Sequence, residues 1–155
     1  MEQISFSDAD FAGKKKVTRR EKLLLEMQDI VPWALLLSAV EPLYPAAGRG
    51  RRPYPCQSML RIHLMQHWFN LSDPGMEDAL YEIESMRRFA RFRGITDALP
   101  DETTILNFRH LLEKYELTAV LVEAINAQLK AQGLLVSKGT MVDATLIHAP
   151  SSTKN

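Results

Sequence analysis

The spacing of apolar residues along the chain predicts a series of helices with short connections. Thr18 and Glu21 form a capping box, in which each side chain satisfies a backbone N–H, ahead of apolar residues at helical spacing. Pro32 and Pro55 each suit the first turn of a helix, and the residues after Pro55 are apolar nearly all round. We therefore expect a helix over about 19–31, a second after Pro32, and a third after Pro55 that is central and buried.

Three further helices follow from the same signals. A fourth begins at Ser72 and continues until Gly94, and a fifth begins at Asp101. A sixth covers roughly 117–132 and stops at Gly133. The pattern to this point is typical of an all-helical domain.

The spacing of apolar residues changes after Gly139 from a helical to an alternating pattern. Residues 140–147 are rich in β-branched side chains and alternate in polarity, which predicts one β-strand. A strand cannot pair with itself, because its backbone groups need partners. We therefore expect a helical domain over 1–136 and, over 137–155, the incomplete start of a second domain.

Composition narrows the class of protein without naming a function. The 155 residues are 46% hydrophobic and carry 19 Lys and Arg against 19 Asp and Glu, as in an ordinary globular domain. The longest apolar run, Ile30 to Val40, is too short to span a bilayer, and no secretory signal is evident. We expect a cytoplasmic protein with no membrane partner. The single Cys56 excludes an internal disulfide.

The neutral total conceals three basic clusters. A basic arm covers Lys14, Lys15, Lys16, Arg19, Arg20 and Lys22; an arginine loop contributes Arg49, Arg51 and Arg52, with Arg61 beyond it; and a third group is Arg87, Arg88, Arg91 and Arg93. Each cluster can be a solvated surface or the last turn of a helix. Lys and Arg side chains on flexible segments beside glycine are also suited to contact phosphates, so the arm and the loop are candidates for DNA binding.

The fifth predicted helix has a polar face. Thr103, Asn107, His110 and Lys114 share one side, opposite Ile105, Phe108 and Leu112. With the fourth helix and the turn before it, this helix can form a helix-turn-helix whose polar face reads bases. A solvated helix face has the same pattern, so both interpretations remain open.

Two groups of residues raise the question of a metal. His63 and His67 stand four apart on one helix, but no third ligand is evident, which favours packing or surface roles. Asp143 lies within the predicted strand among apolar residues, as an edge residue facing water or as a carboxylate that binds a metal for phosphoryl chemistry.

Several motifs resemble one known family across essentially the whole chain. They include Gly50-Arg-Arg-Pro-Tyr-Pro55, Met59-Leu-Arg-Ile-His63, Met76-Glu-Asp-Ala-Leu-Tyr-Glu-Ile83, Asn107-Phe-Arg-His110, Val142-Asp-Ala-Thr145 and Ala149-Pro-Ser-Ser-Thr-Lys-Asn155. The chain is similar to the N-terminal part of bacterial insertion-sequence transposases of the InsH type, in the insertion-sequence-five group. That resemblance implies a helical N-terminal domain followed by a ribonuclease-H-like catalytic domain with an Asp-Asp-Glu triad and two Mg²⁺ ions.

In this family pattern Asp143 matches the first triad aspartate, as a catalytic and metal-binding residue. The second Asp and the Glu have no counterpart in the 155 residues, so we expect the chain alone to be inactive and to hold no cofactor. The expected partner is double-stranded DNA, as element terminal inverted repeats and target DNA. The residues expected to contact it are Lys14, Lys15, Lys16, Arg19, Arg20, Arg49, Arg51, Arg52, Thr103, Thr104, Asn107, Arg109 and His110.

Other interpretations remain open beside this portion of a cut-and-join transposase. One is a stand-alone DNA-binding module that occupies element ends and inhibits transposition. Another is an interaction domain whose apolar helices form homo-oligomers or associate with full-length transposase. A third is an inert pseudogene product.

Overall fold

The structure is a computed structural model that describes residues 6–46, 48, 50 and 52–133. These residues form α-helices and one short 3-10 helix, with no strand among them, which confirms the mainly α prediction. In chain order the elements are α1 (Phe6–Ala12), α2 (Arg19–Ile30), α3 (Trp33–Val40), η1 (Glu41–Leu43), α4 (Cys56–Trp68), α5 (Asp73–Glu82), α6 (Glu84–Phe89), α7 (Glu102–Lys114) and α8 (Leu117–Ala131). The predicted strand at 140–147 lies outside the described residues.

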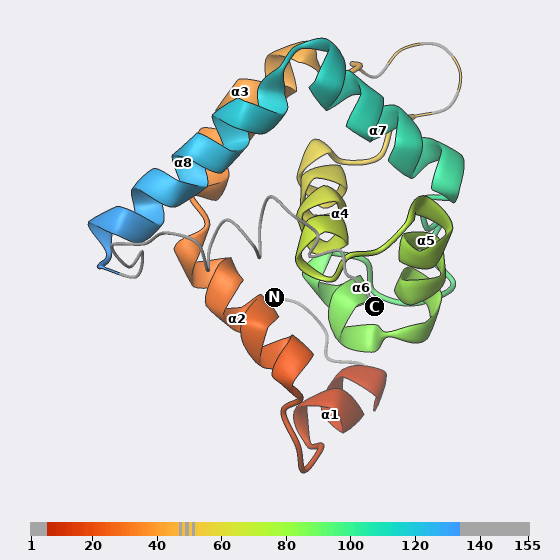
Figure 1. Ribbon diagram of the computed structural model, residues 1–155. Helices are drawn as coiled ribbons and strands as arrows, with labels where there is room; N and C mark the ends of the chain where they lie inside the picture. Colours follow the sequence, from red (N-terminus) through yellow and green to blue (C-terminus); the bar gives the residue numbers. More distant parts are fainter. Residues whose placement is uncertain (1–5, 47, 49, 51, 134–155) are drawn as a thin grey trace, which may run out of the picture.

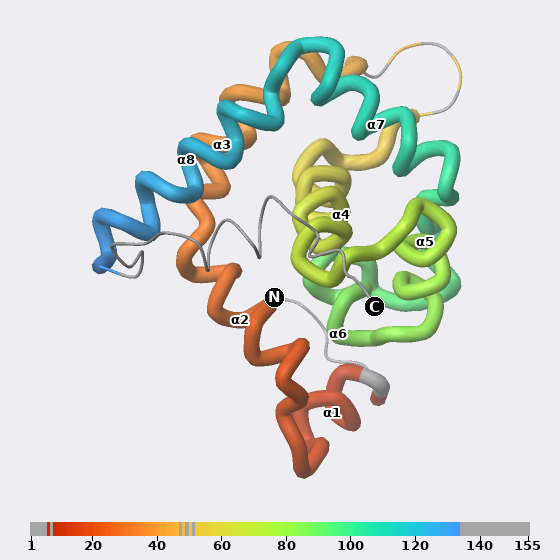
Figure 2. The backbone as a smooth tube through the Cα atoms, viewed as in Figure 1, coloured from red at the N-terminus to blue at the C-terminus, as the bar shows by residue number. Residues whose placement is uncertain are grey.

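Helix α4 is the centre of the fold, as its apolar sequence predicts. Eleven of its 13 residues are buried. Figures 1 and 2 show it enclosed by α2 and α3 on one side and by α5, α6 and α7 on the other. Helix α8 lies along α3, and α7 packs on both α4 and α5. The position of α7 is therefore fixed by the core.

Side-chain caps mark the helix starts that the sequence predicts. The Thr18 hydroxyl accepts from the Glu21 N–H at 3.1 Å, and the Asp101 carboxylate accepts from the Thr104 N–H at 2.8 Å. The reciprocal half of the predicted capping box does not form, because the Glu21 carboxylate pairs with Lys14 Nζ at 2.5 Å instead.

The fourth predicted helix is two helices. The chain breaks at Ile83, whose backbone is extended with φ −116° and ψ 104°, and α6 ends at Phe89 rather than at Gly94. Buried Arg87 explains how the break is tolerated. Its guanidinium donates to the carbonyls of Leu80 at 2.8 Å and Tyr81 at 3.1 Å, which are end groups of α5 without a helical partner.

Within the described residues, no single helix combines the length and the apolar character needed to cross a bilayer. Helix α2 and the segment Trp33–Leu43 have the required length and apolar character only when taken together, and the chain bends by 76° between them.

Candidate nucleic-acid interface

Helix α7 presents the polar face that its sequence spacing predicts. Ile105, Phe108 and Leu112 are buried against the core, with at most 4% of each exposed. The exposed residues on its other side include Thr103, Asn107, His110 and Lys114. Their side chains can therefore meet a ligand from solution.

A cavity of about 270 Å³ lies beside this face, between α7 and the segment that precedes α4. Its aromatic walls include Tyr44, Tyr54 and Phe108, and Arg52, Thr104 and Asn107 also line it. The structure thus brings one residue of the predicted arginine loop to the predicted reading helix. Arg52 is exposed and enters no hydrogen bond or ion pair with the described part of the chain.

Two tyrosines hold the cavity wall in place. Tyr44 Oη donates to the Tyr54 carbonyl at 2.5 Å, and Tyr54 Oη donates to the Leu99 carbonyl at 3.2 Å. The Tyr44 ring also meets Phe108 edge-on, with centroids 6.0 Å apart. Burial, with a smaller contribution from Cys56, raises the pKa of Tyr44 to about 12, so its hydroxyl stays protonated. Both hydroxyls are committed to donating to backbone carbonyls, which leaves Arg52, Thr104 and Asn107 to supply donors to a ligand.

Sequence inspection missed these aromatic walls. The signal for them is present, since Tyr44 precedes Pro45 and Tyr54 stands between Pro53 and Pro55. Proline fixes the backbone beside each ring, which suits a rigid wall.

Arg109 differs from its exposed neighbours on α7, because its partly buried guanidinium is held in an ion pair with another helix. It forms a bidentate ion pair with Asp73 of α5, with N–O distances of 2.5 and 2.9 Å. Gln66 of α4 donates to the same carboxylate at 2.6 Å. The hydrogen bond from Arg109 is the main reason that the pKa of Asp73 lies below its ordinary 3.8. This pair locks α7 onto α5, which makes Arg109 a positioning residue.

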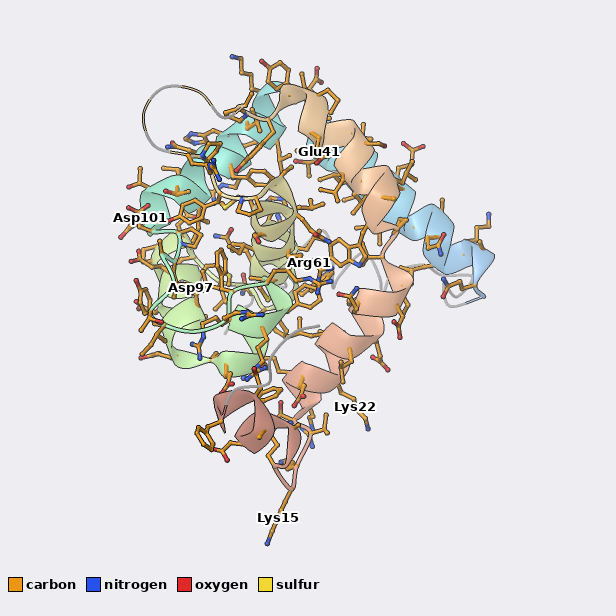
Figure 3. All side chains as sticks on the ribbon, turned by 180° about the vertical axis from the view of Figure 1, so that it is seen from behind. Lys15, Lys22, Glu41, Arg61, Asp97 and Asp101 are labelled. Atoms are coloured by element: carbon orange, nitrogen blue, oxygen red, sulfur yellow. The ribbon has the colours of Figure 1, made fainter. Side chains whose placement is uncertain are left out.

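The basic arm is exposed but remote from α7. Its predicted contact residues lie between α1 and the first turn of α2, and Figure 3 shows Lys15 at the end of the molecule away from Asp101, the N-cap of α7. Lys14 lies over the Phe11 ring at 4.4 Å as well as pairing with Glu21. Lys15, Lys16, Arg19 and Arg20 are also exposed. The basic arm and the polar face of α7 are therefore two separate surfaces.

Three predicted site residues, the metal candidate Asp143 and the DNA-contact candidates Arg49 and Arg51, lie outside the described residues. Across the described ranges, no group of three or more His, Cys, Asp or Glu side chains can hold a metal ion. His63 and His67 meet edge-on with ring centroids 4.5 Å apart. Burial, then the nearby His67 and Arg109, lower the pKa of His63 to about 3, as expected of a neutral packing residue.

Comparison with known protein families supplies a classification. A family model described as Transposase domain (DUF772) matches residues 11–111, which is more than half of the chain. No solved structure matches the chain. The matched region includes the basic arm, α4, and most of α7. The chain therefore belongs to the transposase domain family DUF772.

Proposed function

We propose that this chain is the DNA-binding part of an insertion-sequence transposase of the InsH type, in the insertion-sequence-five group. Its membership of a transposase domain family supports a role in transposition. The finer placement rests on the motifs from Gly50 to Asn155 that resemble this group. The DNA-binding role is supported most by one observation: Arg52 lines the same cavity as Thr104 and Asn107 of α7.

In this proposal α7 is the recognition helix of a helix-turn-helix, and it enters the major groove with its polar face. The Asn107 amide has the donor and acceptor that pair with adenine, and Thr103 or Thr104 can meet a thymine methyl group. Arg52 and His110 border the same face and supply phosphate contacts. The Asp73 pair with Arg109 supports this role, because a helix that reads bases must be held rigidly.

The basic arm serves a different purpose in the same complex. Lys15, Lys16, Arg19 and Arg20 are exposed, and a cluster of this kind binds the phosphate backbone without reading sequence. Because the arm is remote from α7, it would contact a separate part of the DNA from the part that α7 reads.

We also propose that residues 137–155 begin a ribonuclease-H-like catalytic domain. Asp143 would be the first acid of its Asp-Asp-Glu triad, and this assignment rests on the resemblance of Val142-Asp-Ala-Thr145 alone. In such domains Mg²⁺ stabilises the attacking and leaving oxygens of phosphodiester cleavage and joining.

A salt titration tests the DNA-binding role. The probe is a fluorescent duplex that carries the inverted repeat flanking the coding sequence, titrated at two salt concentrations. The proposal predicts an affinity that falls as a power of the salt concentration, because Lys and Arg side chains that bind phosphates release the counterions of the DNA. An absence of binding, or an affinity that does not change with salt, would refute it.

A further inference from the structure

Arg61 of α4 is a cation in the interior of the protein. Only 1% of the residue is exposed, and Figure 3 shows it between α4 and the α2 side of the molecule. Its guanidinium carbon lies 4.0 Å from the Trp33 ring centroid and 4.8 Å from that of Phe89. These faces stabilise a positive charge, but they accept no conventional hydrogen bond.

The hydrogen-bonding capacity of Arg61 is only partly used within the described residues. Nη1 donates to Gln28 Oε1 at 2.7 Å and to the Phe89 carbonyl at 3.2 Å. Nε and Nη2 have no acceptor there, and no carboxylate pairs with the guanidinium. Burial, followed by repulsion from Arg91, lowers the pKa of Arg61 to about 10, so the side chain remains charged at neutral pH. A buried charge of this kind calls for an anion.

Arg61 borders a cavity of about 190 Å³ between α2 and α6. The charged and amide side chains that line it are Glu21, Gln28, Arg61, Arg88 and Arg91. Exposed Leu25 and Arg91 also line the cavity, so it reaches the surface beside them. A water molecule occupies about 30 Å³ of liquid, so this space is ample for a small oxyanion.

The charges around the cavity do not cancel. Arg88 is paired with Asp8 at 2.8 Å and with Glu84 at 2.5 Å, and Glu21 is paired with Lys14. Arg91 makes no ion pair with any described residue. Two guanidinium groups, those of Arg61 and Arg91, therefore border one cavity, and neither forms an ion pair with a carboxylate of the described residues.

We propose that the cavity between α2 and α6 binds a phosphate group through Arg61 and Arg91. A phosphate carries up to two negative charges and several acceptor oxygens, which match two arginines better than one carboxylate does. The phosphate can be free in solution or part of a DNA backbone. The site is separate from the α7 face and does not depend on the function proposed above.

Calorimetric titration of the full chain with inorganic phosphate tests this site without DNA. Chloride and acetate at matched ionic strength are the controls. We expect saturable phosphate binding, weakened about tenfold or more by Arg91→Gln, since a charge-assisted hydrogen bond is lost. Arg93→Gln is the matched control, because Arg93 is an exposed arginine two residues away that does not line the cavity. It should leave phosphate affinity unchanged.

A second readout follows Arg61 itself, because Arg61 variants can fail to fold. The buried Nε–H should exchange slowly, and its NMR resonance should shift saturably with phosphate. Absence of that shift, or equal phosphate affinity in wild type and Arg91→Gln, would overturn the proposal. Duplex DNA that competes with phosphate identifies the backbone as the source, and DNA that binds without competing identifies free phosphate.

Discussion

At the scale of single residues, three arginines connect helices through different kinds of partner. Arg61 lies against aromatic rings, Arg87 donates to backbone carbonyls, and Arg109 pairs with a carboxylate. A buried guanidinium needs several acceptors, because it has five N–H donors in a fixed plane. The pairing of Arg109 with Asp73 is the most easily tested, since both partners lie partly exposed on neighbouring helices.

Replacing Asp73 with Asn should destabilise the domain at neutral pH. The change removes a two-pronged ion pair, and we expect the free energy of unfolding to fall by about 1 to 2 kcal/mol. The pKa of Asp73 is lower in the folded state than its ordinary 3.8, so this stabilisation is full above that value and is lost as pH falls through the folded pKa. Urea unfolding at neutral and strongly acidic pH measures both effects.

Asp78→Asn is the control for this experiment, because Asp78 is an exposed aspartate on the same helix. An equal loss of stability in the two variants would contradict a specific role for the Asp73 pair.

His63 should make the domain sensitive to mild acid. Its pKa is about 3 in the folded protein against an ordinary 6.5, so the unfolded chain binds a proton more readily between these values. Stability should therefore fall as pH drops below 6.5, by up to about 1.4 kcal/mol per pH unit for this one group. His63→Leu should flatten that dependence, and exposed His110→Gln should not. Unfolding curves with the same pH slope in wild type and His63→Leu would refute this role.

Residue roles were predictable where they depend on local sequence. The Thr18 and Asp101 caps act on N–H groups three residues away, so spacing alone reveals them. The partner of Arg109 is 36 residues distant, and its selection depends on how α5 packs against α7. Arg61 follows the arginine loop in a stretch without acids, but it is buried on an apolar helix, which a count of charges does not reveal.

At the scale of elements, the break between α5 and α6 is the main departure from the sequence prediction. Apolar spacing continues across Ile83, so periodicity gave no signal for it. The break is stabilised by a side chain four residues further on, which reaches back to α5. The other expected starts at Pro32, Pro55 and Ser72 agree with the structure, because prolines and caps act locally.

Arg87→Met should weaken this corner of the fold. The substitution keeps a long side chain but leaves the carbonyls of Leu80 and Tyr81 without their donor, and we expect a loss of about 1 to 3 kcal/mol. Chemical unfolding followed by circular dichroism measures the loss. Arg93→Met, at an exposed site, provides the comparison. Similar stability in both variants would show that Arg87 does not hold the break together.

At the scale of the whole molecule, the two candidate DNA-binding surfaces are a basic arm and the polar face of α7. The length and composition allowed one neutral domain, but neutrality hides surfaces that lie at different ends. Their separation could not be foreseen from sequence, because it depends on where α4 places the helices around it. What the sequence did predict is that α7 turns Asn107 outward and Phe108 inward.

The arm and the reading face should respond differently to substitution. Lys15→Gln with Lys16→Gln should weaken binding to every duplex about equally and lower the salt slope by about 1 for each phosphate that is no longer neutralised. Fluorescence anisotropy over a range of salt concentrations measures that slope. Lys130 is an exposed lysine at the end of α8, and Lys130→Gln should change neither the affinity for DNA nor the salt slope. A sequence-dependent loss in the arm variant would contradict a purely electrostatic role.

The central claim is that α7 reads element DNA, and a comparison of two duplexes tests it most directly. Wild-type protein and Asn107→Ala are titrated, at one salt concentration, with the element-end duplex and with a scrambled duplex of equal length. Wild type should prefer the element end, and Asn107→Ala should lose about 1 to 3 kcal/mol of that preference while keeping its affinity for the scrambled duplex. Equal binding of both duplexes by wild type, or a preference that survives in Asn107→Ala, would contradict the account.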